Sequence, residues 1–131
     1  MSHLLIFGLG YTAERIAAAM RAHGWHVRAT GSAGDIAFPD RDAVGAAMAE
    51  ATHILSSVPP DRASGGDPVL DHYGDALTGR ALFYLSSTGV YGDRQGAWVD
   101  EATPTIAEAG EGRRNARAEA DLAWLNLGAR V

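Results

Sequence analysis

The sequence predicts an α/β fold built on a doubly wound parallel sheet. Short apolar runs alternate with segments whose apolar residues recur at helical spacing. The first apolar run enters a glycine turn that leads directly into an Ala-rich helix. Strands that alternate with helices connect in parallel through right-handed crossovers. These observations together favour one parallel sheet with helices on its faces.

The expected elements follow one another along the chain without an internal repeat. Predicted strands cover residues 4–7, 25–30, 52–58 and 81–86, and helices are expected after the glycine turn, over 41–49, within 68–78 and over about 113–127. Gly24 is a natural end for the first helix. Asp40 can cap the second helix, in which Val44, Ala47 and Met48 recur at helical spacing.

Two later segments carry predictions about packing. Residues 81–86 form a near-continuous apolar run, which is typical of a strand buried on both faces of a sheet. A long loop follows this strand. In the last helix, one stripe contains Ala116, Ala120, Ala123 and Leu127.

The glycine turn has the spacing Gly-x-Gly-x-x-Ala. Gly8 lets the chain turn tightly out of the strand, Gly10 leaves bare backbone for a pyrophosphate, and Ala13 lets the helix pack closely on the sheet. The helix N-terminus supplies free N–H groups for phosphate. The pattern alone also fits an ordinary strand-turn-helix, but the strand before it and the helix after it favour a dinucleotide site.

Composition excludes several function classes. With 131 residues there is room for one domain, and a net charge of -5 without a basic run argues against a nucleic-acid partner. The chain has no cysteine, and its five histidines lack metal-ligand spacing. It also has no lysine, so all eleven basic residues are arginine. Without a signal peptide or membrane-spanning stretch, we expect a cytoplasmic protein with no membrane partner.

One later segment is more specific than the glycine turn. Residues 85–93 read Leu-Ser-Ser-Thr-Gly-Val-Tyr-Gly-Asp, and residues 96–104 end in Asp-Glu-Ala-Thr-Pro. The chain resembles the extended short-chain dehydrogenase/reductase superfamily, in its NAD-dependent epimerase/dehydratase group. This resemblance implies a Rossmann-like sheet, a nicotinamide cofactor and a small-molecule substrate site over the carboxyl ends of the strands.

The resemblance implies which residues would take part in hydride transfer. Ser87, four residues before Tyr91, matches the family's catalytic hydroxyl, and Ser86 would lie against the nicotinamide. The alternative for Ser87 is a hydroxyl that only satisfies local backbone groups. The family's Tyr-x-x-x-Lys pair aligns with Arg113 and Arg117, so the general acid is missing. An arginine cannot donate a proton efficiently near neutral pH.

Two explanations of this departure stay open. The first is an atypical enzyme that moves a hydride between the nicotinamide and a substrate alcohol or ketone. In it Arg117 would hold the ribose, and Arg113, or water ordered by Ser87, would meet the substrate charge. The second is a dinucleotide-binding or redox-sensing module without turnover. The two arginines also fit a solvated helix face, where Glu111, Glu119 and Asp121 offset their charge.

The candidate cofactor site draws on four segments. It comprises Gly8, Gly10, Tyr11, Thr12, Ala13, Thr30, Ser32, Ser57, Val58 and Ser86. No carboxylate directly follows the second strand, and Asp35 lies too far along the chain to be relied on. Arg28 is near a small hydroxyl-bearing loop, which favours NADP over NAD. Alternatively, Arg28 is a strand residue that faces solvent.

Residues 128–131 read as the start of another strand. We therefore expect residues 1–131 to be the NAD(P)-binding N-terminal part of a longer chain, whose substrate-binding C-terminal portion is not represented. A naturally short domain with a frayed tail is the alternative. Because the family often pairs through helices, a homodimer is one option for the assembly.

Overall fold

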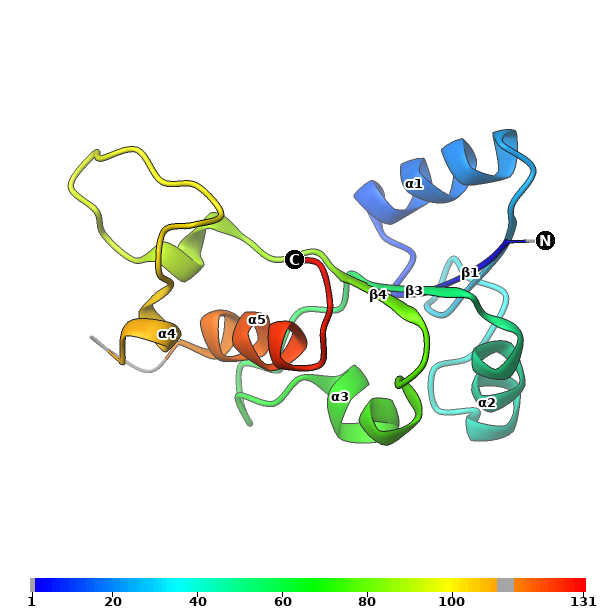
Figure 1. Ribbon diagram of the computed structural model, residues 1–131. Coiled ribbons are helices and arrows are strands. Elements are labelled where there is room, and N and C mark those ends of the chain that lie inside the picture. The colour runs from blue at the N-terminus through cyan, green and yellow to red at the C-terminus, as the bar shows by residue number, and fades with distance from the viewer. Residues whose placement is uncertain (1, 111–114) are drawn as a thin grey trace.

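The computed structural model describes residues 2–110 and 115–131 of the protein (Figure 1). The strands are β1 (His3–Phe7), β2 (His26–Ala29), β3 (His53–Ser56) and β4 (Ala81–Tyr84). The helices are α1 (Tyr11–Ala22), α2 (Arg41–Glu50), α3 (Pro68–Tyr73), α4 (Ile106–Ala109) and α5 (Ala116–Asn126), with short 3-10 turns η1 (Gly74–Ala76) and η2 (Thr88–Tyr91). No helix among the described residues is long and apolar enough to cross a membrane.

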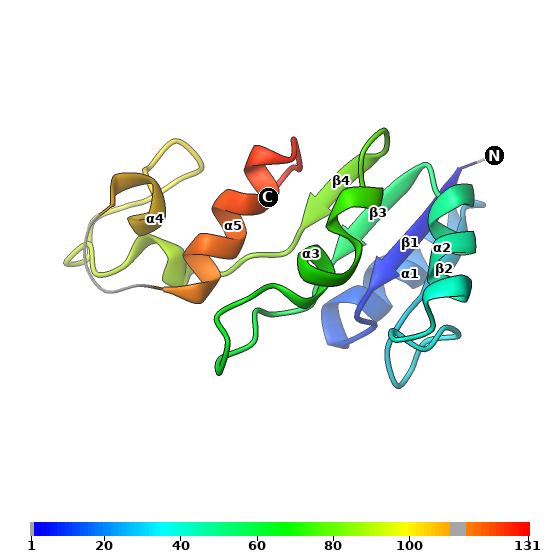
Figure 2. The same ribbon diagram turned by 90° about the horizontal axis from the view of Figure 1, so that it is seen from below.

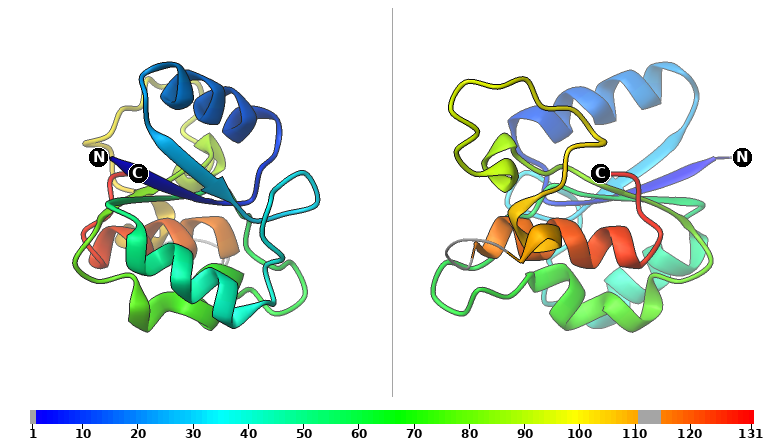
Figure 3. Two further views of the ribbon diagram at one scale, coloured as in Figure 1. Left: turned by 90° about the vertical axis from the view of Figure 1, so that its right-hand side faces the viewer. Right: turned by 60° about the vertical axis from the view of Figure 1, so that its left-hand side comes forward.

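The strands form one parallel sheet in the order β2-β1-β3-β4 (Figure 2). The chain runs outward from β1 to β2, returns across β1 to β3, and continues to β4. Because the connections are right-handed, the helix of the step from β1 to β2 lies on one face of the sheet, and the helices of the steps in the opposite direction, toward β3 and β4, lie on the other face. Accordingly, α1 covers one face, and α2, α3 and α5 cover the other (Figure 3). The predicted doubly wound parallel fold is confirmed, with its switch point between β1 and β3.

Each face of the sheet has its own apolar core, because alternate residues of a strand point to opposite faces. On β1, Leu4 and Ile6 pack toward α1, whereas Leu5 and Phe7 pack toward α2 and α3. The α1 core also contains Ala13, which is 1% exposed. The prediction that Ala13 allows close packing of α1 on the sheet is confirmed.

Local signals place the ends of the early helices where the sequence predicts them. Asp40 caps α2 by accepting a hydrogen bond from Ala43 N at 3.1 Å. The expected core residues of α2, namely Val44, Ala47 and Met48, are all buried. The first helix ends at Ala22, and Gly24 follows with φ +82. These features depend on short-range contacts, which the sequence displays directly.

The last helix differs from its prediction. It begins at Ala116, while the expected start at Arg113 lies outside the described residues. Its buried residues are Ala118, Ala120, Asp121 and Trp124. Of the predicted apolar stripe, Ala120 is buried, Ala116 and Ala123 are half-buried, and Leu127 is exposed. The buried side of α5 is set by Trp124, whose indole stacks on Tyr84 of β4 with 5.4 Å between ring centroids.

The expected long loop after β4 also contains structure. It holds η2 and the one-turn helix α4. Thr105 and Glu108 form a capping box at the start of α4, in which each side chain bonds the other's backbone N–H. The sequence signal for such a box, Thr-x-x-Glu, was present but is weak without a following apolar run.

A buried polar contact fastens α5 to the start of α3. Asp67 is 6% exposed and caps α3 through bonds from Val69 N (2.9 Å) and Leu70 N (3.1 Å). Its other carboxylate oxygen accepts a bond from Trp124 Nε1 at 2.9 Å. One carboxylate thus satisfies a helix end and an indole N–H that would otherwise be buried without a partner.

The prediction that β4 is buried on both faces is wrong for the α1 side. Leu82 and Tyr84 are buried toward α5, but Phe83 and Leu85 on the opposite face are only half-buried. The reason is that α1 covers the β1 and β2 side of that face and does not reach over β4 (Figure 3). Along the outer edge of β4, Arg130 makes a parallel bridge with Phe83.

Candidate functional site

The candidate site lies at the carboxyl ends of the strands, where the sheet switches direction between β1 and β3. In open α/β sheets this is the place where ligands bind. The glycine turn leaves β1 here, and Ser57 and Val58 leave β3 beside it. Fold topology therefore brings together segments some fifty residues apart that the sequence had assigned to the cofactor.

The two glycines of the turn have different roles. Gly8 has φ +87, and a Cβ there would lie 3.0 Å from both the Ser57 hydroxyl and a Val58 methyl group. Gly10 has φ -96 and is exposed, and a Cβ there would meet nothing within 4 Å. Gly8 is thus needed by the protein's own packing. The bare backbone at Gly10 serves no packing contact and leaves room for a ligand.

Helix α1 begins at this bare backbone. Gly10 is its N-cap, has no side chain to bond the first turn, and accepts the first helical bond from Glu14 N. The N–H groups ahead of Glu14 therefore have no partner within the helix. Tyr11 and Thr12 are exposed, and the Arg15 guanidinium lies 3.5 Å from the centroid of the Tyr11 ring. This arrangement places donors and positive charge where an anion can approach.

Two hydroxyls assigned to the cofactor also form hydrogen bonds to the glycine turn. Thr30 is 1% exposed, and its Oγ1 accepts a bond from Gly8 N at 3.1 Å. The Ser57 hydroxyl donates to the carbonyls of Phe7 and Gly8. Both groups are therefore occupied within the protein. Of the predicted hydroxyls near the second strand, Ser32 is the one that is exposed.

The turn after β2 brings the Asp35 carboxylate back against β2, although the sequence places Asp35 several residues beyond the end of this strand. Asp35 accepts bonds from Ala29 N at 2.9 Å and from Arg28 Nε at 2.6 Å. The tight turn needs Gly34, because a Cβ there would overlap the Ala29 carbonyl. Arg28 is therefore a partly exposed residue whose charge is paired with Asp35. Partial burial acts to raise the pKa of Asp35, but the hydrogen bonds outweigh it and leave the pKa below its ordinary value.

This pair makes a pH-dependent contribution to stability. Because the folded-state pKa of Asp35 is depressed, its contribution is complete above the ordinary pKa of 3.8 and is lost as pH falls through the folded value. We expect Asp35→Asn to lower the unfolding free energy near neutral pH by less than about 1 kcal/mol, since the pair is partly exposed. Urea unfolding near pH 7 and at about pH 3 measures this. A deficit of equal size at both pH values would contradict the assignment.

The end of β4 presents two adjacent serines with different surroundings. The Ser86 hydroxyl oxygen is buried and has no hydrogen-bond partner among the described residues. Ser87 is exposed at the start of η2, and its side chain does not cap that turn. The alternative role of Ser87, satisfying local backbone groups, is not supported at the start of η2, where its side chain makes no capping bond. Within residues 2–110 and 115–131, no hydrogen bond to either hydroxyl is found, which leaves both able to contact a substrate or cofactor.

Arg117 is brought to the same place by α5. Its Nη1 donates to the Tyr84 hydroxyl at 3.0 Å and to the Leu85 carbonyl at 3.1 Å. Burial raises the pKa of Tyr84 even beside this guanidinium, so the phenol stays protonated at neutral pH. Two acceptors hold the guanidinium, and one of them, the Leu85 carbonyl, belongs to the residue directly before Ser86. Arg113 lies outside the described residues.

No tyrosine takes the place of the missing general acid at the serines. Tyr73 and Tyr84 are buried, and the Tyr91 hydroxyl donates to the Asp100 carbonyl at 2.9 Å. Tyr11 is exposed, but it belongs to the glycine turn. In the described part of the chain there is also no group of three or more acidic or histidine side chains that could hold a metal ion. The site suits dinucleotide binding better than proton transfer.

Several solved structures have a similar fold. A functionally unknown conserved protein from Silicibacter pomeroyi is 35% identical with a TM-score of 0.69, and the match covers 97% of this chain and 50% of that one. A short-chain dehydrogenase/reductase superfamily protein from Agrobacterium tumefaciens with bound NAD is 18% identical, with a TM-score of 0.63 and coverage of 96% and 44%. UDP-glucose 4-epimerase from Thermus thermophilus, in complex with NAD, is 20% identical, with a TM-score of 0.55 and coverage of 98% and 52%.

The chain therefore spans about half the length of the structures it matches. No protein-family model matches the sequence, and no curated protein matches it. The fold expected from the resemblance to extended short-chain dehydrogenase/reductases is confirmed by these likenesses.

Proposed function

We propose that this chain is the dinucleotide-binding part of an atypical extended short-chain dehydrogenase/reductase. The protein would be an NAD(P)-dependent oxidoreductase or epimerase-like enzyme that acts on a small-molecule alcohol or ketone. The observation that carries the proposal is Gly10: it is exposed, without a packing role, and placed at the N-terminus of α1 beside the switch point of the sheet. The substrate-specificity portion would lie outside residues 1–131.

Some of the described residues would bind the cofactor, and Ser87 would orient the substrate. The N–H groups at Tyr11, Thr12 and Ala13 would receive the pyrophosphate, while Thr30 and Ser57 hold the turn that presents them. A bound nicotinamide would supply the hydride acceptor or donor. Val58 and Ser86 would lie along the cofactor. Ser87 would orient the reacting substrate oxygen by hydrogen bonding.

Arg117 would act as a fixed cation at the end of β4. Its bonds to Tyr84 and Leu85 hold one side of the guanidinium. The remaining donors would contact the ribose or an anionic group of the substrate. We retain Arg113 as a second candidate for substrate charge.

A module without turnover is the second candidate function. It is favoured by the absence, among the described residues, of a tyrosine hydroxyl that could serve Ser87 as proton donor. Such a protein would bind the dinucleotide and respond to its redox state without consuming it. Replacement of Ser87 by alanine separates the two functions. An enzyme would lose turnover of carbonyl substrates with its cofactor affinity unchanged, whereas a module would show no turnover in either form.

We propose NADP as the preferred cofactor. The nearest carboxylate to the end of β2, Asp35, is already bonded to Arg28 and Ala29 N, so it is not free to accept bonds from a ribose diol. The exposed residues Gly31, Ser32 and Ala33 carry no charge, and the charge of the exposed Asp35 is offset by its ion pair with Arg28. A 2′-phosphate would therefore meet no unpaired acidic side chain in residues 31–35.

Titration with NADPH and NADH tests this function. We expect saturable binding of both, followed by nicotinamide fluorescence and by a rise in Tm, with affinity for NADPH about tenfold higher, equivalent to about 1.4 kcal/mol. Equal affinities would remove the NADP preference but keep the dinucleotide site. Failure of the longest available polypeptide to bind either cofactor would overturn the proposed function.

A further inference from the structure

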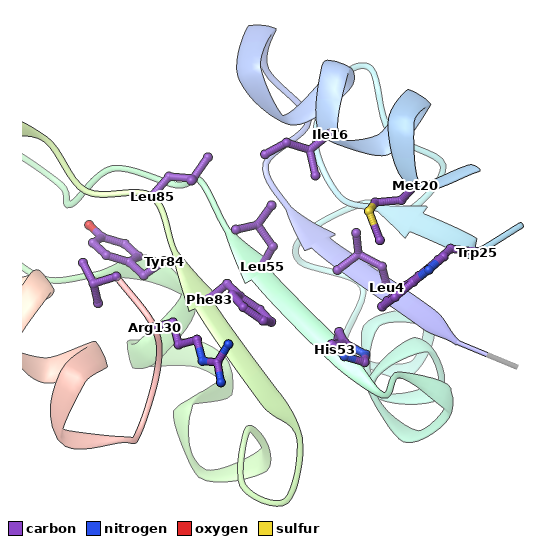
Figure 4. Close-up of a pocket in the computed structure, with 11 residues that line it drawn as sticks. Leu4, Ile16, Met20, Trp25, His53, Leu55, Phe83, Tyr84, Leu85 and Arg130 are labelled. Atoms are coloured by element: carbon purple, nitrogen blue, oxygen red, sulfur yellow. The ribbon is translucent and has the colours of Figure 1, made fainter. Parts of the chain in front are cut away.

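A buried stack of side chains connects the start of α3 with Arg117 of α5. The Trp124 indole donates from Nε1 to the Asp67 carboxylate at 2.9 Å, and it stacks on the Tyr84 ring with an angle of 13° between the planes. Figure 4 shows Tyr84 on the side of β4 away from α1. The Tyr84 hydroxyl accepts a bond from Arg117 Nη1 at 3.0 Å. These four side chains therefore form one connected unit.

The inner members of this stack are fixed in place. Trp124 is 0% exposed and Tyr84 is 2% exposed, so the core encloses both rings. Asp67 is held as well, because its second carboxylate oxygen caps α3. Close-packed side chains around a buried ring leave no room for another rotamer. The Tyr84 hydroxyl is therefore an acceptor with a fixed position.

Arg117 ends the stack at the carboxyl end of β4. Its Nη1 carries two N–H groups and makes two bonds, to the Tyr84 hydroxyl and, at 3.1 Å, to the Leu85 carbonyl. Because a guanidinium is planar, two acceptors on one nitrogen fix the orientation of the whole group. Nε and Nη2 make no hydrogen bond within residues 2–110 and 115–131, and the side chain is half-buried. Three N–H groups are thus available in an orientation that Tyr84 and Leu85 set.

Ser86 adds a second polar group at the same strand end. It directly follows Leu85, whose carbonyl holds Arg117. The Ser86 hydroxyl oxygen is buried and has no hydrogen-bond partner in the described part of the chain. A buried hydroxyl without a partner is costly unless a ligand supplies one. The unused N–H groups of Arg117 and the Ser86 hydroxyl therefore point to a polar ligand at the end of β4.

We propose that Tyr84 is a positioning residue for the cofactor, whose hydroxyl holds the Arg117 guanidinium in the orientation that contacts the nicotinamide ribose. This inference rests on the proposed function, in which Arg117 meets the cofactor. A lysine at position 117 would have three N–H groups on one nitrogen, and two of them would be spent on Tyr84 and Leu85. An arginine makes the same two bonds and keeps three donors on two further nitrogens.

The test removes single hydroxyls from the longest available polypeptide. Tyr84→Phe keeps the ring on Trp124 and deletes only the bond to Arg117. Tyr73→Phe is the matched control, because Tyr73 is also buried and uses its hydroxyl for one bond, to the Phe38 carbonyl. Each tyrosine variant is made alone and in combination with Arg117→Ala. Nicotinamide fluorescence gives the affinities for NADPH and NADH, and thermal unfolding of the same samples gives Tm.

We expect Tyr84→Phe to weaken binding of NADPH and NADH by the same factor, about five- to tenfold, because the nicotinamide ribose is common to both. Tyr73→Phe should leave both affinities unchanged. When Arg117→Ala is already present, Tyr84→Phe should have no further effect, since the hydroxyl acts only through the guanidinium. A purely structural role of Tyr84 would weaken binding equally with and without Arg117. The Tm of Tyr84→Phe should fall no further than that of Tyr73→Phe.

The parent polypeptide distinguishes the two ways in which the proposal can fail. If the parent binds neither cofactor, the proposed function is overturned, and this role of Tyr84 with it. If the parent binds, the role of Tyr84 alone is overturned by unchanged affinity in Tyr84→Phe, by an equal loss in Tyr73→Phe, or by an equal loss with and without Arg117. A much larger fall in Tm than in Tyr73→Phe also overturns it, because Tyr84 would then serve the fold.

Discussion

Replacement of Gly10 by valine is expected to abolish dinucleotide binding while the protein stays folded. Gly10 has an ordinary φ of -96, and a Cβ added there would meet nothing within 4 Å, so a side chain can leave the backbone at this position without a clash at Cβ. In the proposed complex that space belongs to the pyrophosphate. We expect a loss of affinity for NADPH of about 100-fold, equivalent to about 2.8 kcal/mol, with Tm unchanged. Fluorescence titration and thermal unfolding of the same sample measure both quantities.

Gly8→Ala is the matched control two residues earlier. Alanine at φ +87 is strained, and its Cβ would press against the Ser57 hydroxyl and a Val58 methyl group at 3.0 Å. We expect this variant to lose about 2 to 4 kcal/mol of unfolding free energy. A Gly10→Val protein that binds NADPH like the parent would show that the turn serves only packing. A destabilised Gly10→Val protein would contradict the assignment of open space at Gly10.

Replacement of Asp67 by alanine is expected to cause a large loss of stability. The carboxylate caps α3 and accepts the bond from the buried Trp124 indole. Loss of an N-cap costs about 1 kcal/mol, and an indole N–H left buried without a partner costs a further 1 to 3 kcal/mol. We expect a total of about 3 kcal/mol, measured by urea unfolding, which corresponds to a fall in Tm of roughly 10 °C.

Asp40→Ala separates the two contributions. Asp40 caps α2 in the same way, but it is exposed and bonds only the helix backbone in the described contacts. We expect this variant to lose about 1 kcal/mol. If Asp67→Ala costs no more than Asp40→Ala, the bond to Trp124 does not contribute and the anchoring of α5 must come from ring stacking on Tyr84.

The parts of the site that the sequence predicted well are those governed by neighbouring residues. The glycine turn, the close packing of Ala13 and the cap at Asp40 all depend on contacts within a few positions. Contacts between distant segments were not predicted. Thr30 and Ser57 were assigned to the cofactor by their place at strand ends, and the structure adds that each also bonds the glycine turn through its hydroxyl.

The sequence by itself determined four strands, the alternation of strands with helices, and hence a parallel sheet with a nucleotide-type turn after its first strand. These follow from hydrophobic periodicity and from glycine, which are local properties. Only the tertiary structure decided that Asp35 returns to Arg28, that Trp124 rather than Leu127 faces the core, and that one side of β4 is uncovered. The physical reason is that burial and pairing depend on which elements meet across the sheet, and periodicity within one element does not specify its partners.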